Sequence, residues 1–167
     1  AAAAAAPAST PLRPVAFFAS DQTGRSARST LVSTGRAGAD LRERVAAVLG
    51  AKTAALLAPI DVSLPQRGAR AYGLVSRPGA GAKGEGLRQF VCVNGRPVEM
   101  PRLVRALNEA PRALSSSLVG TRPLAFLHLC LPPASVDVNV APDKRSVFVQ
   151  QEAALVEALR QALAAMW

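Results

Sequence analysis

The chain has 167 residues, of which 50% are hydrophobic and only 4% aromatic, and its formal net charge is +9 at pH 7. This length suffices for one domain with a hydrophobic core, and the composition requires that core to consist mainly of Leu, Val and Ala. No apolar run reaches the roughly 18 residues of a membrane-spanning helix, so we expect no membrane partner. Five phenylalanines are expected as the large core residues: Phe17, Phe18, Phe90, Phe126 and Phe148.

The basic charge suits a polyanionic partner, such as DNA or the phosphates of a nucleotide. A chain this rich in Ala, Arg, Gly and Pro can also owe its arginines to biased coding, and both explanations stay open. Cys92 and Cys130 lie in apolar, strand-like runs, which indicates buried thiols in a reduced, intracellular protein. With His128 they are too few for a structural zinc site, so no metal is expected. The position of His128 in an apolar strand favours a partly buried, hydrogen-bonded ring over a catalytic one.

The first part of the chain predicts a linker and a strand pair. Residues 1–13 include the tract Ala1–Ala6 and are interpreted as a low-complexity linker, which implies a segment attached upstream. Short apolar runs at Val15–Ala19 and Thr30–Ser33 predict two strands of a hairpin, with a turn at Asp21–Gly24.

A helix is predicted between Asp40, which can cap its N-terminus, and Gly50, which can stop it. Its apolar residues recur at helical spacing and define one face, while its charged residues are expected on the other side. The apolar set is Leu41, Val45, Val48 and Leu49, and the charged set is Arg42, Glu43 and Arg44. A shorter helical turn is expected at Lys52–Leu57.

Strands are predicted at Ile60–Leu64 and Ala71–Ser76, on either side of a polar turn at Pro65–Gly68. The segment Gly79–Gly86 contains a Gly-x-Gly-x-x-Gly pattern that matches a dinucleotide-binding loop. Such a loop requires a helix directly after it, whereas the next segment, Leu87–Val93, is predicted to be a strand. The glycines are therefore interpreted as a surface loop.

A hairpin and a second helix follow. Asn94–Gly95 separates the apolar runs Leu87–Val93 and Arg96–Val98, which predicts a two-residue turn with positive φ at both positions. Pro101 suits the first position of the helix, and Pro111 is expected to end it.

The last part of the chain predicts a strand, a charged loop and a helix. Pro123–Leu131 predicts a long apolar strand, and Gln151–Met166 predicts a closing helix with leucines at four-residue spacing. Between them, Val136–Val140 alternates valine with polar residues, and Pro142 ends this strand. The loop that follows presents Asp143, Lys144 and Arg145. It is either a solvated charged turn or a loop that places a lysine against a phosphate. The order of elements predicts an α+β fold, a mixed sheet with helices packed on one face.

Two blocks of this sequence carry a family resemblance. Residues 136–145, Val-Asp-Val-Asn-Val-Ala-Pro-Asp-Lys-Arg, resemble the signature that closes the N-terminal half of MutL-family DNA mismatch repair proteins. Residues 88–98, Arg-Gln-Phe-Val-Cys-Val-Asn-Gly-Arg-Pro-Val, resemble the strand–hairpin block of the same family. The blocks keep the family's order, and their details are more similar to the eukaryotic post-meiotic-segregation branch. The resemblance covers residues 14–167.

The resemblance implies that residues 14–167 form the transducer domain, the second domain of the N-terminal region, with a ribosomal protein S5 domain 2-like fold. The motifs of the GHKL-type ATPase domain are absent from this chain, so the chain by itself is assigned no complete active site. The parent protein is implied to be an ATPase. ATP with Mg²⁺ would be bound mainly by the missing upstream domain.

Candidate site residues follow from the same resemblance. Lys144 would reach the γ-phosphate of ATP across the domain interface and is the candidate catalytic residue. Three neighbours are further candidates for nucleotide binding: Asn139, Asp143 and Arg145. Four arginines are candidates for DNA phosphate contacts: Arg96, Arg102, Arg105 and Arg112. The family's DNA-binding arginine near the start of that helix is matched here by Pro101, with Arg102 beside it, and a solvated helix face is the alternative.

The partners implied by the resemblance are double-stranded DNA, a second MutL-type subunit in a heterodimer, and MutS-type mismatch recognition proteins, with a nuclear location. Two alternatives are open. One is a different enzyme domain of the same fold, such as the second domain of a type II topoisomerase ATPase or part of a small-molecule kinase, although their phosphate loops are not found. The other is a stand-alone basic module that binds nucleic acid without a nucleotide.

Overall fold

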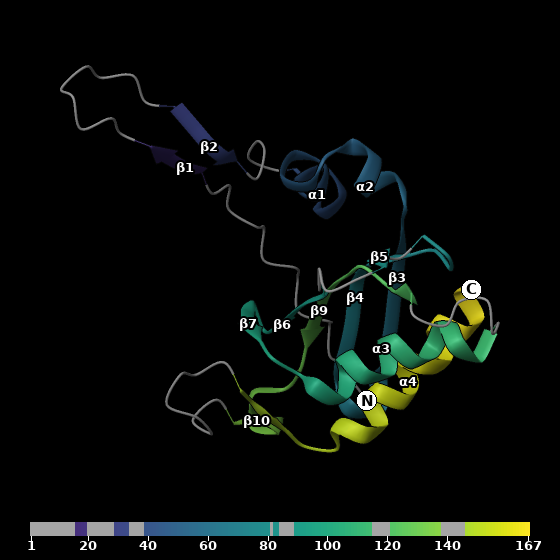
Figure 1. Ribbon diagram of the computed structural model, residues 1–167. Coiled ribbons are helices and arrows are strands. Elements are labelled where there is room, and N and C mark those ends of the chain that lie inside the picture. The colour runs from purple at the N-terminus through teal and green to yellow at the C-terminus, as the bar shows by residue number, and fades with distance from the viewer. Residues whose placement is uncertain are drawn as a thin grey trace. The chain divides into compact units, whose positions relative to one another are not determined.

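The structure is a computed structural model, shown in Figure 1, that describes residues 16–19, 29–33, 39–80, 82–83, 89–114, 121–137 and 146–167. The chain divides into two compact units, Ala1–Leu56 and Leu57–Trp167, and each is described by itself. None of the helices in these described ranges is long and apolar enough to cross a membrane.

The first unit contains a hairpin and two short helices. Strands β1 (Ala16–Ala19) and β2 (Ser29–Ser33) pair antiparallel, which confirms the predicted strand pair. They precede helices α1 (Leu41–Leu49) and α2 (Ala51–Ala55).

Asp40 caps helix α1 as predicted, and the cap is reciprocal. Its carboxylate accepts a hydrogen bond from the Glu43 backbone N–H at 2.7 Å, and the Asp40 N–H donates to the Glu43 carboxylate at 3.0 Å. This capping box satisfies two backbone donors that the first turn leaves without partners. The predicted helix faces are partly wrong: Arg44 is buried, with its Nε donating to the Ala39 carbonyl, while Val48 is exposed.

The second unit is built on a five-stranded mixed sheet with the strand order β3-β4-β9-β6-β7. Its strands are β3 (Leu57–Leu64), β4 (Ala69–Ser76), β6 (Gln89–Val93), β7 (Arg96–Val98) and β9 (Ala125–Cys130). Neighbouring strands pair antiparallel, except β6 and β9, which run parallel. Parallel strands need a crossover connection, and β7 with helix α3 supplies the connection between β6 and β9.

Short strands and 3-10 helices accompany the five-stranded sheet. The two-residue strands β5 (Ala82–Lys83) and β8 (Thr121–Arg122) pair with each other, as do β10 (Val136–Asp137) and β11 (Phe148–Val149). Among the described residues, η1 (Pro65–Arg67) and η3 (Pro133–Ser135) are 3-10 helices.

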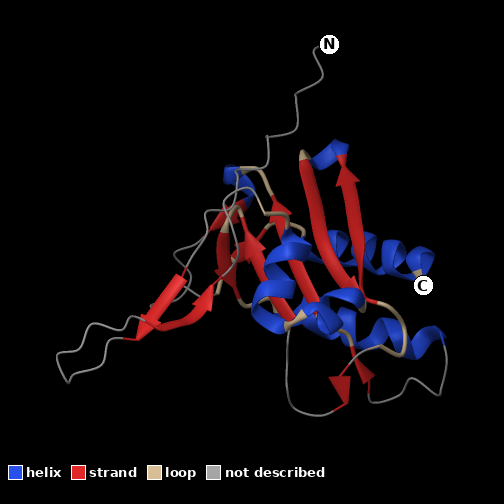
Figure 2. Cartoon of the chain, turned by 90° about the horizontal axis from the view of Figure 1, so that it is seen from above, coloured by secondary structure: helices blue, strands red, loops and turns tan. Residues whose placement is uncertain are grey.

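Helices α3 (Pro101–Leu114) and α4 (Glu152–Met166) lie side by side against one face of the sheet, as Figures 1 and 2 show. Their leucines pack on the inward-facing aliphatic residues of the strands in one continuous core. The largest fully buried helix side chains are Leu103, Leu107, Leu159 and Leu163. Fully burying one such side chain contributes about 1.5–3 kcal/mol, so these four leucines together stabilise the unit. The predicted α+β fold, with helices on one face of a mixed sheet, is confirmed.

The predicted aromatic core is wrong. Phe90 is 53% exposed and Phe148 is 59% exposed, while Phe126 is only partly buried. In β9, Ala125, Leu127 and Leu129 point into the core, so alternation places Phe126 on the opposite face of the sheet. Phe90 lies directly across from Phe126 on β6 and shares that face. The side chains of Phe17 and Phe18 lie outside the described set.

Two further expectations require correction. Pro111 does not end α3: the helix continues to Leu114, and the proline is buried within it. Proline has a helix-compatible φ, so near the end of a helix it removes one backbone hydrogen bond without forcing termination. Cys92 and Cys130 are free but only half-buried, because they lie on the sheet face that α3 and α4 do not cover.

Gly73 allows β4 and β9 to approach closely. It is buried in β4, and a Cβ atom at this position would lie 1.9 Å from the Phe126 carbonyl oxygen. That atom belongs to the backbone of the central strand β9, so it cannot rotate out of the way.

We predict that Gly73→Ala destabilises the protein by about 3 kcal/mol, because the added methyl group overpacks the β4–β9 ladder. Gly95→Ala is the matched control, since Gly95 has φ +83° but no atom within 4 Å of the position that an added methyl group would occupy. It should cost only about 1 kcal/mol of backbone strain. Urea unfolding measures both, and equal losses would contradict the steric argument.

Candidate functional site

The Asn94–Gly95 turn joins β6 to β7 with the predicted backbone geometry. Asn94 has φ +49° and Gly95 has φ +83°, so both turn residues adopt the left-handed region. Asn and Gly are the residues that tolerate this region, and such a turn matches the twist of the two strands. The sequence therefore fixes the register of the hairpin, in which Val93 pairs with Arg96.

The Asn94 side chain ties this turn to the end of β9. Its Nδ2 donates to the Leu131 carbonyl at 2.9 Å, and its Oδ1 accepts from the Leu131 N–H at 2.9 Å. The Asn94 backbone N–H donates to the Leu129 carbonyl at 2.8 Å. We call the two side-chain bonds the Asn94–Leu131 tether. It joins residues that are 37 positions apart, and it lies directly before the prolines that lead into the second motif block.

His128 supports the same turn from β9. Its Nε2 accepts a hydrogen bond from the Gly95 N–H at 3.1 Å, and its ring stacks on Tyr72 with centroids 5.1 Å apart. Burial lowers the pKa of His128 from its ordinary value of 6.5. The predicted partly buried, hydrogen-bonded histidine is confirmed.

The second motif block begins at Val136, shortly after the tethered residue Leu131. After η3, β10 pairs with β11, with Val136 opposite Val149 and Asp137 opposite Phe148. Residues 138–145 lie outside the described residues. The candidate nucleotide residues Asn139, Asp143, Lys144 and Arg145 are among them, so their roles stay predictions. The described residues on either side of this segment are placed by strand contacts: Asp137 pairs with Phe148, and Ser146 forms a bridge with Glu99, directly after β7.

The two motif blocks line one hollow. It has a volume of about 260 Å³ and is bordered by Val93, Asn94 and Arg96 from the first block and by Pro133, Val136 and Val147 around the second. Arg96 is the cation among these residues, and the Asn94 amide is already engaged by Leu131. In the described part of the chain, no group of three or more His, Cys, Asp or Glu side chains could hold a metal ion. The hollow thus suits an anionic or apolar group more than a cation.

The other candidate DNA residues lie on helix α3. Arg102, Arg105 and Arg112 are exposed, and their spacing puts them along one stripe of the helix. Arg96 comes from β7 instead and borders the hollow. The structure therefore brings three of the four predicted arginines onto one surface and assigns the fourth to another element.

Carboxylates pair with several of these arginines. Arg105 Nε donates to Glu109 at 2.8 Å, and Arg102 lies 3.5 Å from Glu152 on α4. The side chains of Arg102 and Arg105 are still 73% and 81% exposed. Exposed ion pairs of this kind contribute little to stability, so a phosphate can compete with the carboxylate. A guanidinium also has five donors, of which one carboxylate uses at most two.

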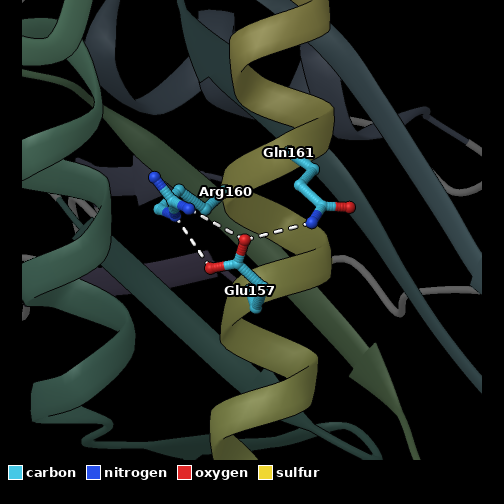
Figure 3. Close-up of polar contacts among 3 residues, drawn as sticks. All are labelled: Glu157, Arg160 and Gln161. Carbon is cyan, nitrogen blue, oxygen red and sulfur yellow. Dashed lines mark hydrogen bonds and ion pairs between the residues drawn. The ribbon is translucent and has the colours of Figure 1, made fainter.

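Helix α4 adds an arginine that the sequence analysis missed. Arg160 donates two hydrogen bonds of 2.8 Å to Glu157, and Gln161 donates a third at 3.0 Å (Figure 3). The hydrogen bonds from Arg160 and then Gln161 lower the pKa of Glu157. The bond to Glu157 raises the pKa of Arg160, and the Glu109 carboxylate on α3 adds to this rise, which indicates that Arg160 faces α3. In the sequence, the three-residue spacing of Glu157 and Arg160 indicates an ion pair on one face of the helix. Only the packing of α4 on α3 shows that Arg160 shares a surface with the arginines of α3. We call Arg102, Arg105, Arg112 and Arg160 the α3–α4 arginine set.

Comparison with known proteins identifies the family. The sequence profile described as "DNA mismatch repair protein, C-terminal domain" matches residues 45–167. The chain belongs to the DNA mismatch repair protein family.

Its relatives include eukaryotic and bacterial members of that family. It is 34% identical to the DNA mismatch repair protein PMS1 of Arabidopsis thaliana over 151 residues, which cover 89% of this chain and 16% of the relative. It is 42% identical to the DNA mismatch repair protein MutL of Opitutus terrae over 115 residues, 69% of this chain and 18% of the relative. The chain thus spans less than a fifth of the length of these relatives. The resemblance to MutL-family mismatch repair proteins is confirmed.

A solved structure supports the fold. The chain matches the "Crystal Structure of N terminal domain of a DNA repair protein" with a TM-score of 0.69 and 29% identity, covering 86% of this chain and 45% of that one. An S5 domain 2-like fold is consistent with this match and with the five-stranded sheet. The family match favours a mismatch repair protein over the topoisomerase and kinase alternatives.

The His128–Gly95 bond predicts a pH dependence of stability. Because the folded pKa of His128 lies below its unfolded value of 6.5, the neutral ring stabilises the fold above that pH, and this contribution is lost as the pH falls through the folded pKa. The free energy of unfolding should therefore drop as the pH falls below 6.5. His128→Phe keeps a ring against Tyr72 but cannot titrate, so its drop should be smaller. Identical pH slopes in chemical unfolding would contradict this role.

Proposed function

We propose that this chain is the transducer part of a MutL-type mismatch repair protein. In this role it couples ATP binding in an adjacent GHKL-type ATPase domain to a change of domain orientation and to DNA binding. The observation that carries the proposal is that the two family motif blocks meet at one hollow, with the Asn94–Leu131 tether holding the first block to the end of β9, shortly before the second block begins. Family membership supplies the context of mismatch repair.

Lys144 is the proposed contact to the γ-phosphate. A lysine ammonium is a compact point charge that can stabilise negative charge on a transferring phosphoryl group. It also distinguishes ATP from ADP, because only ATP has the terminal phosphate for it to meet. A ligand that binds one domain arrangement better than another shifts the population toward that arrangement. Asn139, Asp143 and Arg145 would serve by holding the loop or by adding polar contacts.

The nucleotide itself would be bound mainly outside this chain. The described residues offer a cation at the hollow, Arg96, which suits phosphate. They offer no cluster of carboxylates of the kind that holds Mg²⁺. ATP hydrolysis is therefore proposed for the whole protein, with this chain contributing a single charged group.

We predict that Lys144→Ala in the full-length protein lowers ATP turnover at saturating ATP by at least about tenfold, since a charge at the transferring phosphoryl group contributes several kcal/mol in related chemistry. Steady-state phosphate release measures the effect. Lys52→Ala is the matched control, because Lys52 is an exposed lysine on α2 outside both motif blocks.

The control should match the parent protein. A Lys144→Ala protein with parental turnover and parental thermal stability would reject the role of the lysine. A loss in both variants would instead indicate a general effect of removing positive charge.

The α3–α4 arginine set is the proposed duplex-binding surface. Its members are exposed, come from two packed helices and carry guanidinium groups that bind phosphate without reading sequence. Their carboxylate partners would set how strongly they bind, since each carboxylate competes with a phosphate for the same donors.

We predict that Arg102→Glu together with Arg105→Glu weakens binding to duplexes of any sequence. Each lost phosphate contact should reduce the salt slope of log K by about 1. Titrations at several salt concentrations, followed by fluorescence anisotropy, measure both quantities. Glu109→Gln is the opposing variant: it frees Arg105 and should strengthen binding. Unchanged affinity and slope in the double variant would favour a solvated helix face.

The remaining partners are proposed on the same family basis. The relatives are mismatch repair proteins of eukaryotes and bacteria, and the matches to Arabidopsis thaliana PMS1 and Gallus gallus PMS2 each cover nearly nine-tenths of this chain. We therefore expect a second MutL-type subunit, contact with MutS-type mismatch recognition proteins, and a nuclear location for the full-length protein.

A further inference from the structure

The Asn94–Gly95 turn places a chemically reactive pair of residues at the base of the tether. A two-residue hairpin turn of this type needs positive φ at both positions, and Asn followed by Gly meets that need. The same order of residues favours deamidation, because glycine has no side chain to keep its backbone nitrogen away from the preceding carboxamide. Of the three asparagines in the sequence, Asn94, Asn108 and Asn139, only Asn94 is followed by glycine.

Deamidation is an intramolecular substitution at the Asn94 carboxamide. The Gly95 backbone nitrogen forms a bond to Asn94 Cγ, the bond between Cγ and Nδ2 breaks, and the proton of the Gly95 N–H leaves with Nδ2 as ammonia. Water then opens the succinimide ring. If water breaks the new bond at Cγ, aspartate results. If it breaks the bond to the Asn94 backbone carbonyl carbon, the main chain continues through the side chain as isoaspartate.

Three hydrogen bonds restrain the two reacting groups in the folded protein. The Asn94–Leu131 tether fixes the carboxamide through both Nδ2 and Oδ1, each at 2.9 Å. The Gly95 N–H, whose proton must be lost in the reaction, donates to His128 Nε2 at 3.1 Å. Ring closure requires the Gly95 nitrogen and Asn94 Cγ to come within bonding distance. A carboxamide held at both ends by Leu131 cannot turn toward that nitrogen until the tether breaks.

The turn is protected by these hydrogen bonds and not by burial. Asn94 and Gly95 are both exposed, so water and hydroxide reach them, whereas the flanking Val93 and Val98 are buried. Strand β7 is three residues long and is the last strand in the order of the five-stranded sheet. A short strand at that position opens at a lower free energy than a central strand, because fewer contacts break.

We propose that Asn94 is a deamidation site that the tether and His128 keep unreactive, and that local opening of the hairpin converts it irreversibly. Conversion abolishes the tether. An aspartate has no N–H for the Leu131 carbonyl and places a negative charge beside that oxygen. Isoaspartate adds a backbone atom to a two-residue turn, which disturbs the pairing of Val93 with Arg96. The first motif block then loses its hold on the end of β9. This inference depends on the tether and not on the proposed nucleotide or DNA contacts.

The first test measures deamidation of the full-length protein, folded and unfolded in guanidinium, by mass spectrometry of the peptide that contains Asn94. The reaction raises the mass of that peptide by about 1 Da. Because several hydrogen bonds must break first, the folded protein should react at least about tenfold more slowly than the unfolded protein. Equal rates in the two states would overturn the proposal, and so would an unreactive Asn94 in the unfolded protein. Asn108, which precedes Glu109 in α3, is the internal reference and should stay unmodified.

His128→Phe tests the restraint on the attacking nitrogen. It keeps a ring against Tyr72 but removes the acceptor of the Gly95 N–H, so the folded variant should deamidate about threefold or more faster than the parent. A slower reaction would contradict the protective role, since it would make His128 the base that removes the Gly95 proton. Gly95→Ala identifies the chemistry: its added methyl group hinders the attack, so it should slow the reaction in the unfolded protein.

Leu159→Val is the matched control for a general loss of stability, because Leu159 is fully buried on α4 and makes none of the three hydrogen bonds. Its folded form should deamidate at the parental rate. An equal rise in His128→Phe and Leu159→Val would mean that the reaction requires global unfolding, and it would overturn the local protection proposed here.

Asn94→Asp tests the consequence of the reaction, since it reproduces one of the two products. Loss of the donor to the Leu131 carbonyl should raise the unfolding equilibrium constant by about tenfold or more in chemical unfolding. Asn108→Asp is the matched control and should change it far less, because Asn108 Oδ1 accepts from Gln89 and an aspartate keeps that acceptor. An Asn94→Asp protein as stable as the parent would refute the release of the tether by deamidation.

Discussion

The Asn94–Leu131 tether is the constraint on which the arrangement of the motif blocks depends. Two hydrogen bonds from one amide satisfy both backbone groups of Leu131 at the end of β9, which no strand partner reaches. Each such bond contributes only about 1 kcal/mol, but an unpaired backbone group here would cost more. The tether needs an Asn in a left-handed turn, so one residue sets both the geometry of the hairpin and the point from which the second block starts.

The alternation of side chains gives the five-stranded sheet two different faces. One face carries aliphatic residues that pack on α3 and α4, and the other carries Tyr72, Phe90, Phe126 and His128. Gly73 lets β4 and β9 approach closely, because it has no Cβ to meet the Phe126 carbonyl. Substitution of an exposed residue such as Phe90 can therefore change surface chemistry while the core stays intact.

The sequence predicted the parts of this structure that local rules determine. The cap at Asp40, the Asn94–Gly95 turn and the leucine spacing of α4 each depend on residues within one turn or one hairpin. The wrong predictions concern features that depend on how distant segments of the chain pack together. Phe90 and Phe148 are apolar by type, but strand alternation and the extent of pairing expose them. The arginine surface could not be predicted in full, because it depends on the packing of α4 on α3, which no local pattern encodes. Lys144 was predicted from the family resemblance alone.

One rigid unit would carry both proposed contacts. Lys144 lies in the segment that connects β10 to β11, and the α3–α4 arginine set lies on the helical layer. The helical layer and the sheet share a continuous core, and close-packed cores deform little. A nucleotide that binds Lys144 and pulls on its segment would then reorient the arginine surface together with the sheet.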